Sequence, residues 1–305
     1  MKFRFGIQFI GARTRDEWVE GARRAEGLGF STLVLPDHFG GGQLAPVPAL
    51  MAAGDATSTL RLGTLVLCND FRHPVMLAQE AATLDLLSDG RLELGMGAGW
   101  MRSEYEAVDL PFDPAGTRVE RLEESVQIVR GVLDDGRVDF SGKHYRVAGF
   151  EEAPEPAQDK VPILVGGGSP RILRLAGRHA DIVGVHHDLR AGEARVQDIT
   201  PEGTERKLAW VREGAGERFP ELELQVGVGI FWVTPRPHTV LDGLSRRLNM
   251  PAETLATLPN VLVGSVAEMA EKILEQRERF GISYIVIQGR DMDAAAPLVS
   301  TLSGC

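Results

Sequence analysis

The sequence predicts one closed α/β barrel of eight parallel strands, and three observations support this fold class. Short apolar runs rich in β-branched residues alternate with amphipathic helical patterns along the chain. Successive runs are about 30 residues apart, which implies parallel pairing with right-handed crossovers. About eight strand candidates occur, the number of a (β/α)8 TIM barrel. An open doubly wound sheet would alternate in the same way, so the strand count favours closure.

The expected strands end at polar or glycine residues. They lie at residues 3–9, 32–36, 61–68, 91–97, 162–165, 181–185, 223–233 and 284–288. Helical periodicity is expected at 16–27, 74–87 and 266–280, and glycines that suit a C-cap follow at positions 29, 90 and 281.

Two long irregular stretches interrupt this rhythm and are predicted as insertions in a single domain that covers residues 1–305. The first, about 101–160, contains a charged helix near 118–133 and a hairpin at 138–147 around Ser141-Gly142. The second, about 234–262, carries four prolines and a short helix near 240–248. Loops of this length in a compact domain are usually lids or binding loops.

Composition limits the classes of partner. The 305 residues carry a net charge of −10, which opposes binding to nucleic acid because phosphate backbones attract basic surfaces. No apolar stretch approaches the roughly 20 residues that span a bilayer, and the first residues lack the pattern of a signal peptide. We therefore expect a cytoplasmic protein with a small-molecule substrate and no membrane partner.

Metal and disulfide chemistry find little support in the sequence. Only Cys68 and Cys305 are present, and they lie far apart in the sequence. The adjacent His186 and His187 would point to opposite faces of a strand, so they could not easily share an ion. No metal site is predicted.

Residues that can carry chemistry follow the expected strands at their carboxyl ends, where α/β barrels keep their active sites. Asp37 and His38 follow the second strand, Cys68 ends the third, and Gly97, Ala98 and Gly99 follow the fourth. These positions could line one pocket mouth. The glycine-rich segment suits close approach of a planar ring, although it equally suits dense packing in the barrel.

A second glycine-rich turn follows the fifth expected strand. Gly166, Gly167, Gly168 and Ser169 precede a helix at 171–178, so backbone N–H groups and the helix dipole could face an anion. A tight strand-to-helix turn without a ligand would use the same residues. No Gly-Lys-Ser/Thr of a Walker loop follows, and Trp100 breaks the Rossmann spacing of the glycines at 95, 97 and 99.

Four segments together carry a family resemblance that spans nearly the whole chain. Pro36-Asp-His38, Gly63-Thr-Leu-Val66 with Phe71-Arg-His-Pro74, Gly90 to Trp100, and Val161 to Pro170 resemble the luciferase-like monooxygenase superfamily. Within it, the chain is most similar to actinobacterial oxidoreductases that use the deazaflavin coenzyme F420 rather than FMN. The resemblance implies a barrel with insertions, a homodimer, and hydride transfer at C5 of the ring.

The resemblance also implies roles for individual residues. Asp37 would contact the ring system, and a non-prolyl cis peptide near Leu65 and Val66 would lie behind the ring. Cys68 falls where a small polar side chain contacts the cofactor, although an inert buried thiol would also fit. The turn from Gly166 to Ser169 would bind the cofactor phosphate. Arg171 and Arg174 are candidates to hold the anionic tail.

His38 is the predicted catalytic residue. An imidazole titrates near neutrality, so beside the ring it could move the proton that accompanies a hydride. The alternative is a surface histidine without a chemical role.

At the positions expected to bind the substrate, the sequence differs from the pattern of the family. Trp100 stands where the sugar-phosphate dehydrogenases of the F420 group have a glutamate, and the lysine expected after the sixth strand is missing near Leu189. We therefore predict a pocket with Trp100, His186 and Trp232, and reduction of an activated C=C or C=O bond. The alternatives are an FMN-dependent monooxygenase and a non-catalytic flavin- or deazaflavin-binding barrel.

Overall fold

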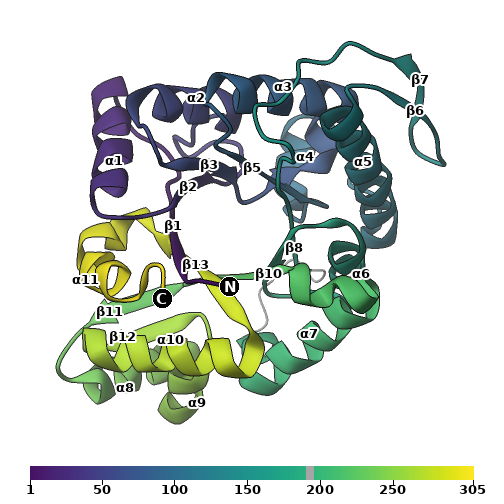
Figure 1. Cartoon of the computed structure of the whole chain (residues 1–305). Helices are drawn as coiled ribbons and strands as arrows, with labels where there is room; N and C mark the ends of the chain where they lie inside the picture. Colours follow the sequence, from purple (N-terminus) through teal and green to yellow (C-terminus); the bar gives the residue numbers. More distant parts are fainter. Residues whose placement is uncertain (190–195) are drawn as a thin grey trace.

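The computed structural model describes residues 1–189 and 196–305 and shows a closed barrel of eight parallel strands (Figure 1). Its strands are β1 (Arg4–Gln8), β2 (Thr32–Leu35), β3 (Arg61–Thr64), β5 (Leu92–Gly97), β8 (Ile163–Gly167), β9 (Ile182–Val185), β10 (Glu223–Gly227) and β13 (Ile282–Gln288). They pair in the order β3-β2-β1-β13-β10-β9-β8-β5, and pairing of β3 with β5 closes the ring. The predicted fold class is confirmed.

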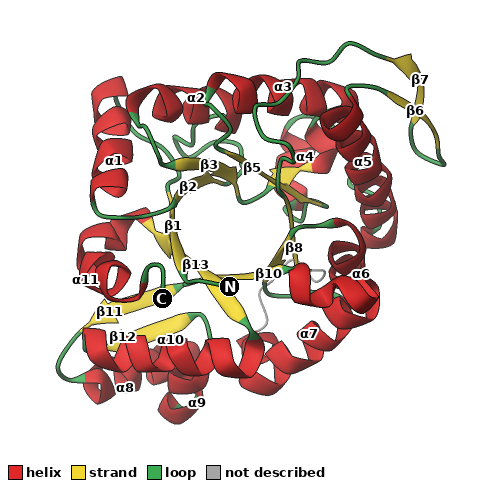
Figure 2. Ribbon diagram, in the orientation of Figure 1, coloured by secondary structure: helices red, strands yellow, loops and turns green. Residues whose placement is uncertain are grey.

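Helices surround the strands on the outside of the barrel (Figure 2). They are α1 (Arg15–Gly27), α2 (Pro46–Ala56), α3 (Pro74–Leu87), α5 (Ala115–Asp135), α6 (Pro170–His179), α7 (Pro201–Ala215), α10 (Val266–Phe280) and α11 (Met292–Leu302). The strands are apolar on both faces because side chains of the helices cover the outside, and all six residues of β5 are buried.

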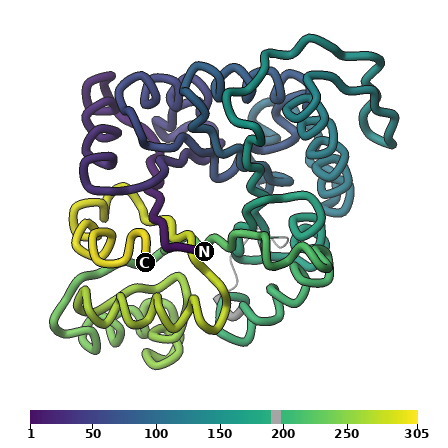
Figure 3. Tube along the Cα trace, viewed as in Figure 1, coloured from purple at the N-terminus to yellow at the C-terminus, as the bar shows by residue number. Residues whose placement is uncertain are grey.

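Local sequence explains where several helices begin and end. Thr14 caps α1 by accepting a hydrogen bond from the Glu17 N–H, and Ser265 forms a capping box with Glu268 at the start of α10. Gly281, at φ +78°, ends α10 in the left-handed conformation. The chain ends meet beside the barrel (Figure 3), where the Phe3 N–H donates to the Cys305 carbonyl over 3.1 Å.

Charged side chains close the amino-terminal end of the barrel. Arg4 donates to Glu93 and to both carboxylate oxygens of Glu223. Its guanidinium also lies 3.6 Å from the centroid of the Tyr284 ring. These residues come from four different strands, so their network fills the lower interior. The carboxyl ends of the strands remain available for a site.

Among the helices that surround the barrel, three were not predicted from the sequence: α2, α7 and α11. The helix α2 was missed because Pro46 and Pro48 suggest a loop, although proline is well tolerated in the first turn of a helix. Pro297 lies inside α11. No helix among the described residues is both long and apolar enough to cross a membrane.

Two predicted strands are each divided in the structure. The stretch 61–68 forms β3 and the short β4 (Leu67–Cys68), both of which pair with β5. The stretch 223–233 forms β10 in the barrel and β11 (Ile230–Val233), which pairs with β12 (Val261–Gly264) in a separate two-stranded sheet. The helices α8 (Pro237–Leu248) and α9 (Ala252–Thr257) pack beside that sheet.

Within the stretch 101–160, α5 is the crossover helix between β5 and β8 and packs against α3. The short α4 (Arg102–Ala107) precedes it. The antiparallel hairpin of β6 (Val138–Ser141) and β7 (Arg146–Phe150) projects from the barrel beyond α5 (Figure 1). Short 3-10 turns occur at Asn69–Phe71, Val196–Ile199, Gly216–Glu221 and Gly289–Asp291.

Candidate active site

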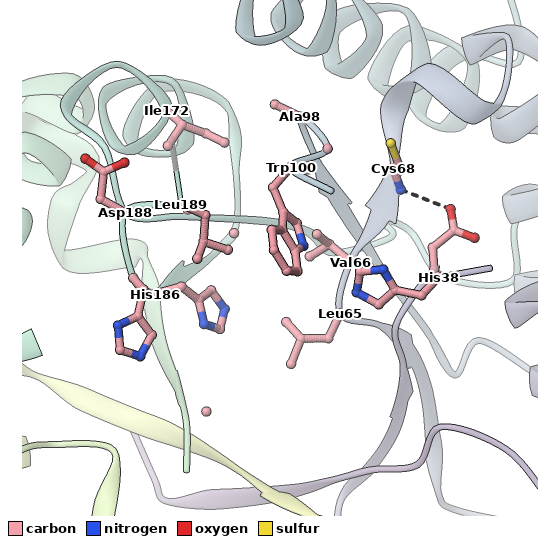
Figure 4. A pocket seen from close by; sticks show the side chains of 18 of the residues that line it. His38, Leu65, Val66, Cys68, Ala98, Trp100, Ile172, His186, Asp188 and Leu189 are labelled. Carbon is pink, nitrogen blue, oxygen red and sulfur yellow. Dashed lines mark hydrogen bonds between the residues drawn. The ribbon is translucent and has the colours of Figure 1, made fainter. Parts of the chain in front are cut away.

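A cavity of about 390 Å³ opens at the carboxyl ends of the barrel strands (Figure 4). Residues at or just beyond the ends of all eight barrel strands contribute to its lining, from Gln8 at the end of β1 to Gln288 at the end of β13. All but one of the predicted site residues lie in this lining: Asp37, His38, Leu65, Val66, Cys68, Gly97, Ala98, Gly99, Trp100, Gly166, Gly167, Gly168, Ser169 and His186.

Trp232 is the exception, and its placement in the substrate pocket was wrong. The prediction assumed one strand over 223–233 that ended at the barrel mouth. The chain instead leaves the barrel after β10, and Trp232 lies in β11 with 58% of its surface exposed, outside the cavity lining.

His38 and Glu104 form a close pair at the cavity wall. The imidazole Nδ1 of His38 is 3.0 Å from each carboxylate oxygen of Glu104, which also accepts the Phe39 N–H over 2.9 Å. The Trp100 ring stands edge-on to the imidazole, with ring centroids 6.0 Å apart. The His38 side chain points into the cavity toward Trp100 (Figure 4).

Asp37 also faces the cavity, but its carboxylate already has partners. Arg72 donates to both oxygens, over 2.5 and 3.0 Å, and the Cys68 N–H donates over 3.0 Å (Figure 4). This buried ion pair holds the loop after β2 against β4.

The Cys68 thiol is not reactive near neutral pH. Burial raises its pKa to about 12, so the thiol stays protonated near neutral pH. Its Sγ lies 3.2 Å from the Tyr105 hydroxyl, which donates to Asp70. The Cys68 side chain is therefore part of the cavity wall and does not act as a nucleophile.

The link between β3 and β4 and the glycine-rich end of β5 form one part of the cavity wall. The peptide between Leu65 and Val66 is cis, at the position that the resemblance implied. Gly99 has φ +71°, and a Cβ there would lie 2.1 Å from the Tyr105 hydroxyl oxygen. Only glycine fits at this position.

The opposite end of the cavity offers hydrogen-bond donors to an anion. The Ser169 side chain does not cap α6, so N–H groups of the first helical turn have no partner within the helix. The neighbouring Arg171 and Arg174 do not line the cavity, because they pair with Glu120 and Glu213 over 2.9 and 2.8 Å.

Arg118 is a buried cation in the cavity lining that the sequence analysis missed. It donates to the Ala98 and Gly99 carbonyl oxygens over 3.2 and 3.3 Å and to the Asp113 carbonyl oxygen, and it stacks on Phe112. No carboxylate pairs with it among the described residues. Burial lowers its pKa. A charged guanidinium without a counter-ion suits an anionic ligand.

His186 lies across the cavity from His38 (Figure 4). Burial, and then the neighbouring His187 and Lys207, lower its pKa to about 4, so this imidazole is neutral near pH 7. The Lys207 ammonium donates to the His186 carbonyl over 2.5 Å, and burial lowers the pKa of Lys207 to about 8. Among the described residues, no three His, Cys, Asp or Glu side chains group as metal ligands.

The sequence is similar to that of known proteins. A family model described as luciferase-like monooxygenase matches residues 5–239. An F420-dependent glucose-6-phosphate dehydrogenase of Nakamurella multipartita is 33% identical over 229 residues, 72% of this chain and 64% of the relative. The enzyme of the same description from Intrasporangium calvum is 35% identical over 174 residues, 54% of this chain and 52% of the relative. The chain therefore matches about half to two thirds of the length of these relatives.

A solved structure with the same fold is the coenzyme F420-dependent tetrahydromethanopterin reductase of Methanopyrus kandleri. It superimposes with a TM-score of 0.78 at 20% sequence identity, and the match covers 99% of both chains. At this identity the likeness concerns the fold.

Proposed function

This chain belongs to the luciferase-like monooxygenase family, and on that premise we propose that it is an oxidoreductase that uses coenzyme F420. The observation that carries the proposal is one cavity lining that combines anion-binding groups with an acid–base pair. The anion-binding groups are the uncapped N-terminus of α6 and Arg118, which no carboxylate pairs within the described residues, and the acid–base pair is His38 with Glu104. Relatives described as F420-dependent support the choice of cofactor.

The residues present fit a flat ring with an anionic tail. Leu65, Val66 and the glycines of β5 form a mostly apolar wall with little bulk, and the helix N-terminus and Arg118 supply positive potential. Reduced F420, when bound, would supply a hydride from C5 of its deazaflavin ring. The chain's own residues would bind the phosphate, exclude water from the ring and hold a proton at His38.

We propose a small organic substrate with an activated C=C or C=O bond, and His38 as the group that protonates it. Trp100 and Leu189 make the lining near His186 apolar and aromatic. Within the described lining, Arg118 is the one Lys or Arg side chain, and we assign it to the cofactor. A sugar phosphate would therefore find no second cation in that lining, which favours an uncharged substrate.

Calorimetry with the purified protein tests the cofactor. We expect micromolar binding of F420 and weaker binding of FMN, because the longer anionic tail of F420 gains more from Arg118 and the α6 N-terminus. Tighter binding of FMN would overturn this choice and favour the FMN-dependent monooxygenase.

Turnover tests the reaction. Oxidation of reduced F420 is followed by absorbance against a panel of enones, aldehydes and ketones, with glucose 6-phosphate and oxidised F420 as the comparison. Binding of F420 without turnover of any compound would instead favour the non-catalytic binding protein.

A further inference from the structure

We propose that Glu104 is a positioning residue that fixes the imidazole of His38 in the tautomer that transfers the proton. The inference rests on the proposed function, in which His38 protonates the substrate. It goes further because it assigns a role to a carboxylate on a different element, 66 positions away in the sequence.

The geometry of the pair is that of a carboxylate that accepts hydrogen bonds. Both Glu104 oxygens lie 3.0 Å from His38 Nδ1, and one of them also accepts the Phe39 N–H. An ionised carboxylate only accepts, so Nδ1 must carry its proton toward Glu104. The Nε2 atom, on the other side of the ring, is then the atom that faces the cavity.

Burial makes this pair costly to disturb. Glu104 is 8% exposed, and within the described residues its carboxylate is hydrogen-bonded by the His38 ring and the Phe39 N–H, with no Lys or Arg among these partners. A buried carboxylate without a basic partner gains most from a ring that can carry positive charge. Nearby Asp37 is not free to serve, because Arg72 already holds both of its oxygens.

The arrangement gives the two nitrogens separate tasks. When the imidazole is protonated, Nε2 can give its proton to the substrate, and the ring becomes neutral while Nδ1–H still donates to Glu104. The proton on Nε2 is then restored from solvent. Carboxylates that orient catalytic histidines in this way control the tautomer without being protonated themselves.

The test is Glu104→Gln, which changes the charge at nearly constant size. In the variant, the amide oxygen would accept the Phe39 N–H and would still lie near Nδ1, but the NH2 group in place of the second oxygen, 3.0 Å from Nδ1, would oppose a proton there. We therefore expect the neutral ring to carry its proton mainly on Nε2. We expect the ¹⁵N resonances of His38, assigned by comparison with His38→Ala, to report protonated Nδ1 in the wild-type protein and protonated Nε2 in the variant.

Kinetics supply the second readout. Glu104→Gln should lower single-turnover oxidation of reduced F420 about 10- to 100-fold with little change in F420 affinity. In a His38→Ala background the same substitution should cost almost nothing, because its effect passes through His38. Glu104→Asp keeps the charge and should retain more activity. Glu106→Gln on the same helix, an exposed residue, should leave the rate unchanged.

The outcomes separate the two proposals. An unchanged ¹⁵N pattern in Glu104→Gln, or an equal rate loss with and without His38, would overturn the positioning role. A wild-type protein that does not oxidise reduced F420 would overturn the proposed function. The ¹⁵N pattern would still decide the role of Glu104 in that case.

Discussion

At the scale of single residues, the site depends on how side chains at the cavity are paired. The His38 ring contacts the Glu104 carboxylate through Nδ1 and faces the cavity on its other side. Both carboxylate oxygens of Asp37, in contrast, accept hydrogen bonds from Arg72. His186 is neutral near pH 7 because of its burial. The three residues look alike as candidates in the sequence, and of the three only His38 is an imidazole in the cavity lining with a carboxylate partner.

The first prediction concerns His38→Ala. We expect the variant to keep its fold and most of its F420 affinity, and to lose at least about a hundredfold in single-turnover oxidation of reduced F420, since general acid catalysis is worth that much. Stopped-flow absorbance measures the rate, and His179→Ala, outside the cavity lining, is the control. A variant with near wild-type rates would leave solvent or His186 as the proton source.

The second prediction concerns Arg118→Met. We expect F420 affinity to fall about 10- to 100-fold, because charge-assisted hydrogen bonds are worth roughly 1.5–3 kcal/mol. Arg118→Lys should lose less, and Arg171→Met, whose guanidinium pairs with Glu120 in the wild-type protein, should have a smaller effect. Calorimetry measures the affinities. Equal losses at positions 118 and 171 would contradict the assignment of the anion end.

At the scale of elements, the turn before α6 shows why glycine alone is weak evidence for a ligand. Gly166, Gly167 and Gly168 have no left-handed φ, but a Cβ at Gly168 would lie 2.2 Å from the His187 carbonyl carbon. A Cβ at Gly167 would lie 2.3 Å from a methyl group of Ile172. Close packing accounts for these glycines with or without a phosphate, so substitutions there would mix stability with binding. Arg118 gives the cleaner test.

The third prediction concerns the capping box of α10. Ser265→Ala removes the side chain that accepts the Glu268 N–H, and we expect the free energy of unfolding to fall by about 1 kcal/mol. Denaturant unfolding measures the loss, while F420 affinity should not change. Ser303→Ala, at an exposed position after α11, is the control and should be neutral. An unchanged free energy of unfolding in Ser265→Ala would contradict this prediction, because it would mean that water satisfies the Glu268 N–H equally well.

At the scale of the whole molecule, the outer faces of α2 and α3 carry an apolar groove. The lining of this groove includes Val47, Met51, Met76 and Leu87, and the last two are 62% and 60% exposed. Contiguous exposed apolar surface often marks a site of protein–protein contact. We propose that a second copy of the chain covers this groove in a homodimer.

The fourth prediction tests the dimer. The double substitution Met76→Asp and Leu87→Lys places charges in the groove, and we expect it to give monomers by light scattering after size-exclusion chromatography. Leu248→Asp, on α8 and away from the groove, should leave the dimer intact. A wild-type monomer would contradict the proposal, as would a charged variant that stays dimeric.

The barrel could be predicted from the sequence because its signal is local. Short apolar runs such as those of β2 and β5, and helical periods such as that of α10, depend on residues within one element. The same logic placed fourteen of the fifteen candidate site residues at one cavity, since all strands of a parallel barrel end at the same rim. The prediction for Trp232 was wrong because the single strand expected over 223–233 is two strands in the structure, β10 and β11, and only β10 belongs to the barrel.

The contacts that define the site depended on the tertiary structure. His38 follows β2 and Glu104 lies in a short helix after β5, so nothing local in either segment indicates the other. Arg118 belongs to a charged helix pattern typical of a solvated face, and only the packing of α5 over the barrel mouth buries it. The sequence by itself determines which elements form and which ends carry polar groups. How loops pair across the rim depends on distances that only the closed barrel sets.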